Sequence, residues 1–174
     1  MKEMTRYGIT LAVICIAASA SLAAVNSLTK PRILAQAKAE EEAGLKEVMP
    51  DAVNFEPVKS GDDVIYYKAY GKDGRFLGAV FKAAGKGYSS TIETIAGITK
   101  DGTITAIKVM SQNETPGLGA RVVETPFTGQ FVNKNTQNLT EVQAITGATI
   151  SSKAVIDSVK KKAEEIKGLI KNER

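Results

Sequence analysis

The chain opens with an uncharged apolar run and continues with shorter stretches in which apolar and polar positions alternate. The run extends from Ile9 to Leu28, twenty residues without a charged side chain. A helix rises about 1.5 Å per residue, so this run would be ~30 Å long, the thickness of the hydrocarbon core of a bilayer. The pattern predicts a transmembrane helix over residues 9–28 that contacts lipid, and it makes residues 1–30 an N-terminal tail and anchor.

A cleaved signal peptide is the competing interpretation of the same run. The stretch "SASLAA" carries small residues at the spacing of a cleavage site. The run is long for the hydrophobic region of a signal peptide, and this length favours the anchor. Charge leaves the orientation open, because Lys2 and Arg6 precede the run and Lys30 and Arg32 follow it.

A helical pattern leads from the anchor into the remaining chain, residues 31–174, which we expect to form one domain. Its apolar positions recur at near-helical spacing between Pro31 and Pro50, and alanine and glutamate add helix propensity. Pro50 ends this predicted helix.

Two pairs of β-rich stretches follow. "DVIYYKAY" and "RFLGAVFKA" flank the turn "GKDG", and "STIETIAGIT" and "TITAIKVM" flank "KDG". Such runs joined by turn residues predict two hairpins. The glycine-rich stretch "AGKGYSS" lies between them and is predicted to be a loop.

The last third of the chain combines loops with a C-terminal helix. "TPGLG" fits neither a helix nor a central strand, so it is predicted to be a loop. "ARVVETPF" is expected to start a short helix that Pro126 interrupts. From Ser152 onward a helix is predicted, with an apolar stripe at Val155, Val159, Ala163, Ile166 and either Leu169 or Ile170. Together these elements predict an α+β domain with an antiparallel β-sheet and flanking helices.

The composition excludes several kinds of chemistry. The chain has no histidine and a single cysteine, Cys15, so it cannot form a Ser/His/Asp triad, a His-based metal site or an intrachain disulfide. We predict no catalytic or metal-binding residue in this chain, and redox chemistry would require a cofactor. The C-terminal lysines alternate with acidic residues, which indicates a solvated helix face rather than nucleic-acid binding.

The stretch "TGATISSK" before the last helix has two interpretations. Ser151 or Ser152 can be the N-cap that satisfies the first amides of the helix, with Gly147 and Ala148 forming a tight turn. Alternatively, the free amides and the helix dipole seat a phosphate, and the small residues leave room for a bulky group.

Two other loops are also open to two interpretations. "ETPGLGA" reads as a surface turn with proline at its second position, or as a loop whose glycines approach a planar ligand. "GKGYSS" lacks the spacing of a Walker or dinucleotide-binding motif, so by itself it reads as a connection between hairpins.

The order of these motifs is more specific than any one of them. "GYSS", then "ETPGLG", then "TGATISS", behind one N-terminal membrane helix, resembles the FMN-binding domain of the G subunit of the Rnf electron-transport complex. The C subunit of the sodium-pumping NADH:quinone reductase is similar. The resemblance covers nearly the whole chain, although "GYSS" matches less tightly than the other two motifs.

The resemblance implies one covalent FMN per chain, held by a phosphoester bond to Thr149, the last hydroxyl residue of the family's element. It implies further cofactor contacts by the neighbouring positions of the three motifs, which are Thr146, Gly147, Ala148, Ile150, Ser151, Ser152, Glu114, Thr115, Pro116, Gly117, Leu118, Gly119, Ser89 and Ser90. Glu114 is expected to fix its own loop.

The resemblance also implies a role. The chain would be a single-pass subunit of the inner or plasma membrane, with its domain on the extracytoplasmic side, that relays electrons in an ion-translocating ferredoxin:NAD+ oxidoreductase. It would have no independent active site. Its partners would be the other membrane and peripheral subunits and a flavin transferase. The alternatives are an anchored flavinylated shuttle outside this complex, a component like the C subunit of the quinone reductase, and a scaffold without cofactor in which "TGATISS" is only a cap.

Overall fold

The computed structural model of the protein describes residues 2–61 and 63–171. The chain divides into two compact units, Met1–Glu42 and Ala43–Arg174, and each is described by itself.

The first unit is the greater part of helix α1 (Lys2–Val48). Within the described residues, one helix is long and apolar enough to cross a membrane, Glu3–Val48, with a mean hydropathy of 2.2 in its most apolar stretch and none of that stretch buried. The hydroxyls of Thr10, Ser21, Ser27 and Thr29 bond to the helix backbone, as Ser21 Oγ does to the Ala17 carbonyl at 2.9 Å, so these four remain paired in an apolar surrounding. The predicted apolar helix is confirmed, and the helix expected after it is its continuation through Pro31.

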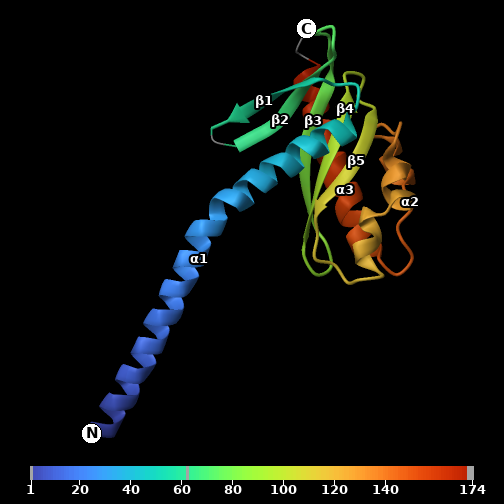
Figure 1. Cartoon of the computed structure of the whole chain (residues 1–174). Coiled ribbons are helices and arrows are strands. Elements are labelled where there is room, and N and C mark those ends of the chain that lie inside the picture. Colours follow the sequence, from blue (N-terminus) through green and yellow to red (C-terminus); the bar gives the residue numbers. More distant parts are fainter. Residues whose placement is uncertain (1, 62, 172–174) are drawn as a thin grey trace. The chain divides into compact units, whose positions relative to one another are not determined.

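The second unit is built on one antiparallel sheet in the order β1-β2-β3-β4-β5 (Figure 1). Its strands are β1 (Asn54–Ser60), β2 (Asp63–Tyr70), β3 (Phe76–Lys86), β4 (Thr91–Thr99) and β5 (Ile104–Ser111). The predicted hairpins are β2–β3 and β4–β5, and both are confirmed. β3 also pairs with β4 as far as Lys86 and Thr91, so the "GYSS" stretch is the connection of a third hairpin.

Each face of the sheet carries a separate apolar core. Helix α3 (Thr149–Ile170) packs on the face to which Phe81 and Ile92 point, and its predicted stripe is buried. The open choice at the end of the stripe is settled, because Ile170 is 3% exposed and Leu169 is 43% exposed. On the other face the last turn of α1 packs on Val80 and Ile95.

The end of α1 is fastened to the sheet by polar contacts as well as by packing. Thr105 Oγ1 donates to the carbonyl oxygen of Val48 at 2.5 Å, which satisfies one of the last acceptors of the helix. Lys108 Nζ lies 2.5 Å from Glu47 Oε2. The anchor helix therefore ends inside the second unit rather than in a linker.

Short helical turns connect β5 to α3. They are η1 (Gly119–Val123), α2 (Thr125–Thr128), η2 (Gly129–Phe131) and η3 (Asn138–Glu141). The expectation that Pro126 interrupts a helix is wrong, because this proline lies in the first turn of α2, where its missing amide costs nothing. Phe127 and Phe131 contact edge to face, with ring centroids 5.5 Å apart, and both are buried.

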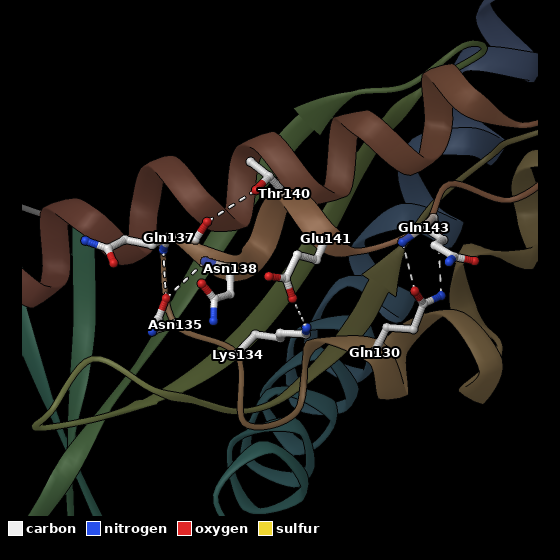
Figure 2. A network of polar contacts seen from close by, with 8 residues as sticks. All are labelled: Gln130, Lys134, Asn135, Gln137, Asn138, Thr140, Glu141 and Gln143. Atoms are coloured by element: carbon white, nitrogen blue, oxygen red, sulfur yellow. Dashed lines mark hydrogen bonds and ion pairs between the residues drawn. The ribbon is translucent and has the colours of Figure 1, made fainter.

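A polar network holds the irregular segment that precedes α3 (Figure 2). Asn135 Oδ1 accepts hydrogen bonds from the amides of Gln137 and Asn138, which starts η3. The side-chain amide of Gln130 bonds to the backbone of Gln143 in both directions, at 2.8 and 3.5 Å. The segment that enters "TGATISS" is thereby fixed without belonging to a strand.

We expect Ile166→Ala to lower the free energy of unfolding by about 2–5 kcal/mol, because it removes a fully buried side chain between α3 and the sheet. Leu169→Ala, three residues further at an exposed position, should cost less than ~1 kcal/mol. Urea unfolding of the detergent-solubilised chain measures both. Equal losses in the two variants would contradict the assignment of the buried face of α3.

Candidate functional site

Three segments from distant parts of the chain meet at the N-terminal end of α3. The connection between β3 and β4, the loop after β5 and the first turn of α3 enclose a pocket of about 550 Å³. It is lined by Tyr88, Glu114, Thr115, Leu118, Gly119, Gly147, Ala148, Thr149, Ile150 and Ser151.

The structure brings together most of the residues that the sequence points to, but not all. The predicted residues that do not line this pocket are Ser89, Ser90, Pro116, Gly117, Thr146 and Ser152. Thr146 lines a smaller neighbouring pocket of about 250 Å³. Tyr88 lines the main pocket and was not predicted individually, although its position inside "GYSS" was the available signal.

The carboxylate of Glu114 lies at the centre of the three segments. Its Oε1 accepts hydrogen bonds from the amides of Ser89 (3.0 Å) and Ser90 (2.9 Å), and its Oε2 from the amide of Tyr88 (3.1 Å). The hydroxyl of Ser151 donates to Oε2 at 2.5 Å. Glu114 therefore fixes the "GYSS" connection and α3, whereas we expected it to fix its own loop.

This arrangement decides what the "GYSS" amides can bind. An isolated row of backbone amides is a good seat for a phosphate, but here all three amides already donate to one carboxylate. These donors are thus occupied inside the protein. They support the pocket through Glu114 rather than by offering hydrogen bonds to an anion.

Glu114 is ionised at neutral pH although its side chain is buried. Burial raises the pKa of the carboxyl group, but the hydrogen bonds from Ser151 and from the amides of Ser90, Ser89 and Tyr88 outweigh this effect. The result is a pKa lowered from 4.5 to about 2. The pocket wall therefore contains a permanent negative charge.

Two glycines are required by the close packing around this carboxylate. A Cβ atom on Gly119 would lie 2.6 Å from Ser151 Oγ and 2.9 Å from Glu114 Oε2. A Cβ atom on Gly87 would lie 2.5 Å from Glu114 Oε1. The glycines of "GYSS" and "GLG" thus serve the internal contact with Glu114.

The first turn of α3 lines the pocket without a side chain to cap it. The N-cap position is Ala148, and no side-chain hydrogen bond caps this end of the helix. Ser151 donates to Glu114, and Ser152 donates to the Ala148 carbonyl (2.9 Å) and accepts from the Ile145 amide (3.0 Å). The prediction that Ser151 or Ser152 is the N-cap is therefore wrong, because both hydroxyls are engaged elsewhere.

The pocket can take a molecule that combines an anionic group with an apolar body. The uncapped helix end and its dipole favour an anion. Three large apolar side chains at the pocket, Tyr88, Leu118 and Ile150, are 72%, 47% and 56% exposed. Thr149 places an exposed hydroxyl in the first turn, next to both features. Across the described parts of the chain, no group of three His, Cys, Asp or Glu residues could hold a metal ion.

Comparison with known proteins agrees with this chemistry. Residues 87–164 match the FMN-binding domain family, and residues 1–48 match the family described as the RnfG N-terminal region. The fold is shared with the C subunit of the Na(+)-translocating NADH-quinone reductase from Parabacteroides distasonis, with a TM-score of 0.51 over 63% of each chain and 21% identity. An apolar membrane-spanning helix followed by this domain defines a membrane-anchored flavoprotein.

Two relatives specify the family. The chain is 40% identical over 173 residues to the G subunit of the ion-translocating oxidoreductase complex of Methanosarcina acetivorans, covering 91% of this chain and 92% of that protein. It is 34% identical to the G subunit of the proton-translocating ferredoxin:NAD(+) oxidoreductase complex of Clostridium ljungdahlii, covering 90% and 88%. The chain belongs to the family of G subunits of ion-translocating oxidoreductase complexes. The resemblance and the expectation of a subunit of an ion-translocating oxidoreductase are confirmed.

We expect the stabilising effect of the Glu114 carboxylate to be complete above about pH 4.5 and to be lost as the pH falls toward 2. The pKa of this group is lower in the folded than in the unfolded chain, so protons favour unfolding. The difference in free energy of unfolding between the native chain and Glu114→Gln should shrink as the pH falls from about 4.5 to about 2. Urea unfolding at each pH measures this difference.

Glu124→Gln is the matched control, because the Glu124 side chain is 46% exposed and lies outside the pocket. The difference in free energy of unfolding between the native chain and Glu124→Gln should change little over the same pH range. A difference for Glu114→Gln that stays constant or grows on acidification would show that the hydrogen bonds do not hold the ionised form.

Proposed function

We propose that Thr149 carries one FMN per chain through a phosphoester bond and that the pocket beside it holds the flavin. The observation that carries this proposal is the first turn of α3, where an exposed hydroxyl lies beside uncapped amides that line the pocket. The phosphate would accept hydrogen bonds at the helix end, where the dipole favours negative charge. When bound, FMN supplies the electron-transfer chemistry, for which the protein has no group of its own.

The other residues of the motifs would have supporting roles. Gly147 has φ +80° and turns the chain into α3, with Ala148 as a small neighbour of the phosphate. Leu118 and Ile150 would cover the apolar ring system and keep water from it.

The loop behind Leu118 is fixed by its own turn. The Leu118 amide donates to the Thr115 carbonyl at 3.1 Å, around Pro116 and Gly117, so these two residues shape the loop without lining the pocket. Ser89 and Ser90 act through Glu114, and Ser152 through Ala148 and Ile145.

Within a complex, we propose that the chain relays electrons between subunits of an ion-translocating ferredoxin:NAD+ oxidoreductase. Support comes from relatives that are named as G subunits of ferredoxin:NAD(+) oxidoreductase complexes and from the coverage of nearly the whole chain. The single cysteine, Cys15, excludes an iron–sulfur cluster held by this chain alone, so the electrons must come from and go to other subunits. A flavin transferase would install the FMN, because no histidine is present to activate the hydroxyl.

The expected place of the chain is a bilayer crossed once, with lipid around residues 9–28 and residues 31–174 on the extracytoplasmic side. The exposed apolar side chains of α1 support the contact with lipid. A covalent bond would retain FMN in a compartment where the free cofactor is not replenished.

Thr149→Ala should abolish flavin attachment when the full chain is produced together with a flavin transferase. Intact-mass measurement should find the mass of one FMN less one water on the native chain and none on the variant. Thr149→Ser should keep the added mass because it keeps a hydroxyl, and Thr146→Ala should keep it because Thr146 lies outside the pocket. An unmodified native chain beside an active transferase, or a flavinylated Thr149→Ala variant, would refute the attachment.

The position of the domain can be read by labelling a single cysteine. In a Cys15→Ser background, Lys161→Cys places a thiol on an exposed position of α3. A membrane-impermeant maleimide should label this variant in intact cells. A separate variant, Glu3→Cys in the same Cys15→Ser background, carries its thiol before the apolar run and should react only after the membrane is opened. The reverse pattern would place the domain in the cytoplasm.

A further inference from the structure

We infer that the buried carboxylate of Glu114 lowers the reduction potential of the flavin held in this pocket. The inference rests on the proposed function, since it concerns the same pocket. It assigns to Glu114 an electrostatic role on the cofactor in addition to its structural contacts with the "GYSS" connection and α3.

The first observation is the distribution of charge around the pocket. Of the ten lining residues, Glu114 alone is charged, and no lysine or arginine is among them. Lys153 lies near the start of α3, but it is exposed and does not line the pocket. A flavin in this pocket would face one negative charge and no lining cation.

The second observation is that this charge is fixed and screened only weakly. Glu114 is 6% exposed, and its two oxygens are held by five donors on two segments. No ion pair involves Glu114 in the described residues. Salt and water weaken the field of a buried charge less than that of an exposed one.

The sign of the effect follows from the charge that reduction adds. Electrons taken up by the flavin increase the negative charge in the pocket, and a fixed carboxylate raises the energy of that state relative to the oxidised one. The flavin therefore becomes harder to reduce. Ser151 moderates the effect, because its hydroxyl donates to the carboxylate at 2.5 Å and partly disperses the charge.

Two substitutions should therefore shift the potential in opposite directions. Glu114→Gln removes the charge and should shift the midpoint potential to more positive values. Ser151→Ala keeps the charge, removes a donor, and should shift it to more negative values. Damage to the pocket alone would expose the flavin in both variants and move both potentials the same way. Glu124→Gln, an exposed carboxylate outside the pocket, is the matched control and should leave the potential unchanged.

The experiment uses the full flavinylated chain in detergent, titrated with dithionite against indicator dyes, with intact mass confirming one FMN in each sample. A Glu114→Gln chain that carries FMN with an unchanged or more negative potential overturns the inference and leaves the proposed function intact. A native chain that carries no FMN beside an active transferase overturns the proposed function itself. If Glu114→Gln does not fold, Ser151→Ala decides: a more negative potential supports the inference, and an unchanged or more positive one overturns it.

Discussion

The carboxylate of Glu114 and its five hydrogen-bond donors hold together the three segments that form the pocket. The donors are the amides of Tyr88, Ser89 and Ser90 and the hydroxyls of Ser90 and Ser151, which lie 24 to 37 residues away from Glu114 along the chain. Loss of the acceptor would leave these donors unpaired, at about 1–3 kcal/mol for each one that water cannot reach, such as the buried hydroxyl of Ser151. Pocket shape and local stability therefore depend on the same contact.

Because of this contact, two sets of backbone amides near the pocket have different roles. The "GYSS" amides serve the internal carboxylate, and the first turn of α3 is left open toward the pocket. An external anion and an internal anion can then lie in one site without competing for donors. The glycines at positions 87 and 119 make this possible, because a side chain at either would collide with the carboxylate.

Most of the fold could be predicted because its elements have regular periods. The two hairpins and the stripe of α3 follow from alternation and from spacing of three and four. β1 was missed because "NFEPVKS" is an edge strand that contains Pro57 and is largely exposed, so it shows no clear alternation. The position of Pro126 in the first turn of α2 was misjudged because the preceding residues form a separate turn, η1.

The location of the site could be predicted from the sequence, but its hydrogen-bond partners could be predicted only in part. Motif order pointed to the three segments that meet, and most of the expected residues line the pocket. Local rules offered Ser151 or Ser152 as the cap, but the Ser151 hydroxyl donates to the distant Glu114, and the Ser152 hydroxyl bonds to the backbone of Ala148 and Ile145. The contact between Glu114 and the "GYSS" amides joins residues more than twenty positions apart, and no local pattern specifies such a pairing.

A crystal structure of the full chain with FMN attached would test the central claim most directly. The account predicts the phosphate at the amides of the first turn of α3, bonded to Thr149, with Glu114 still accepting hydrogen bonds from the amides of residues 88–90. A phosphate seated on those three amides, with the Glu114 carboxylate displaced, would contradict it.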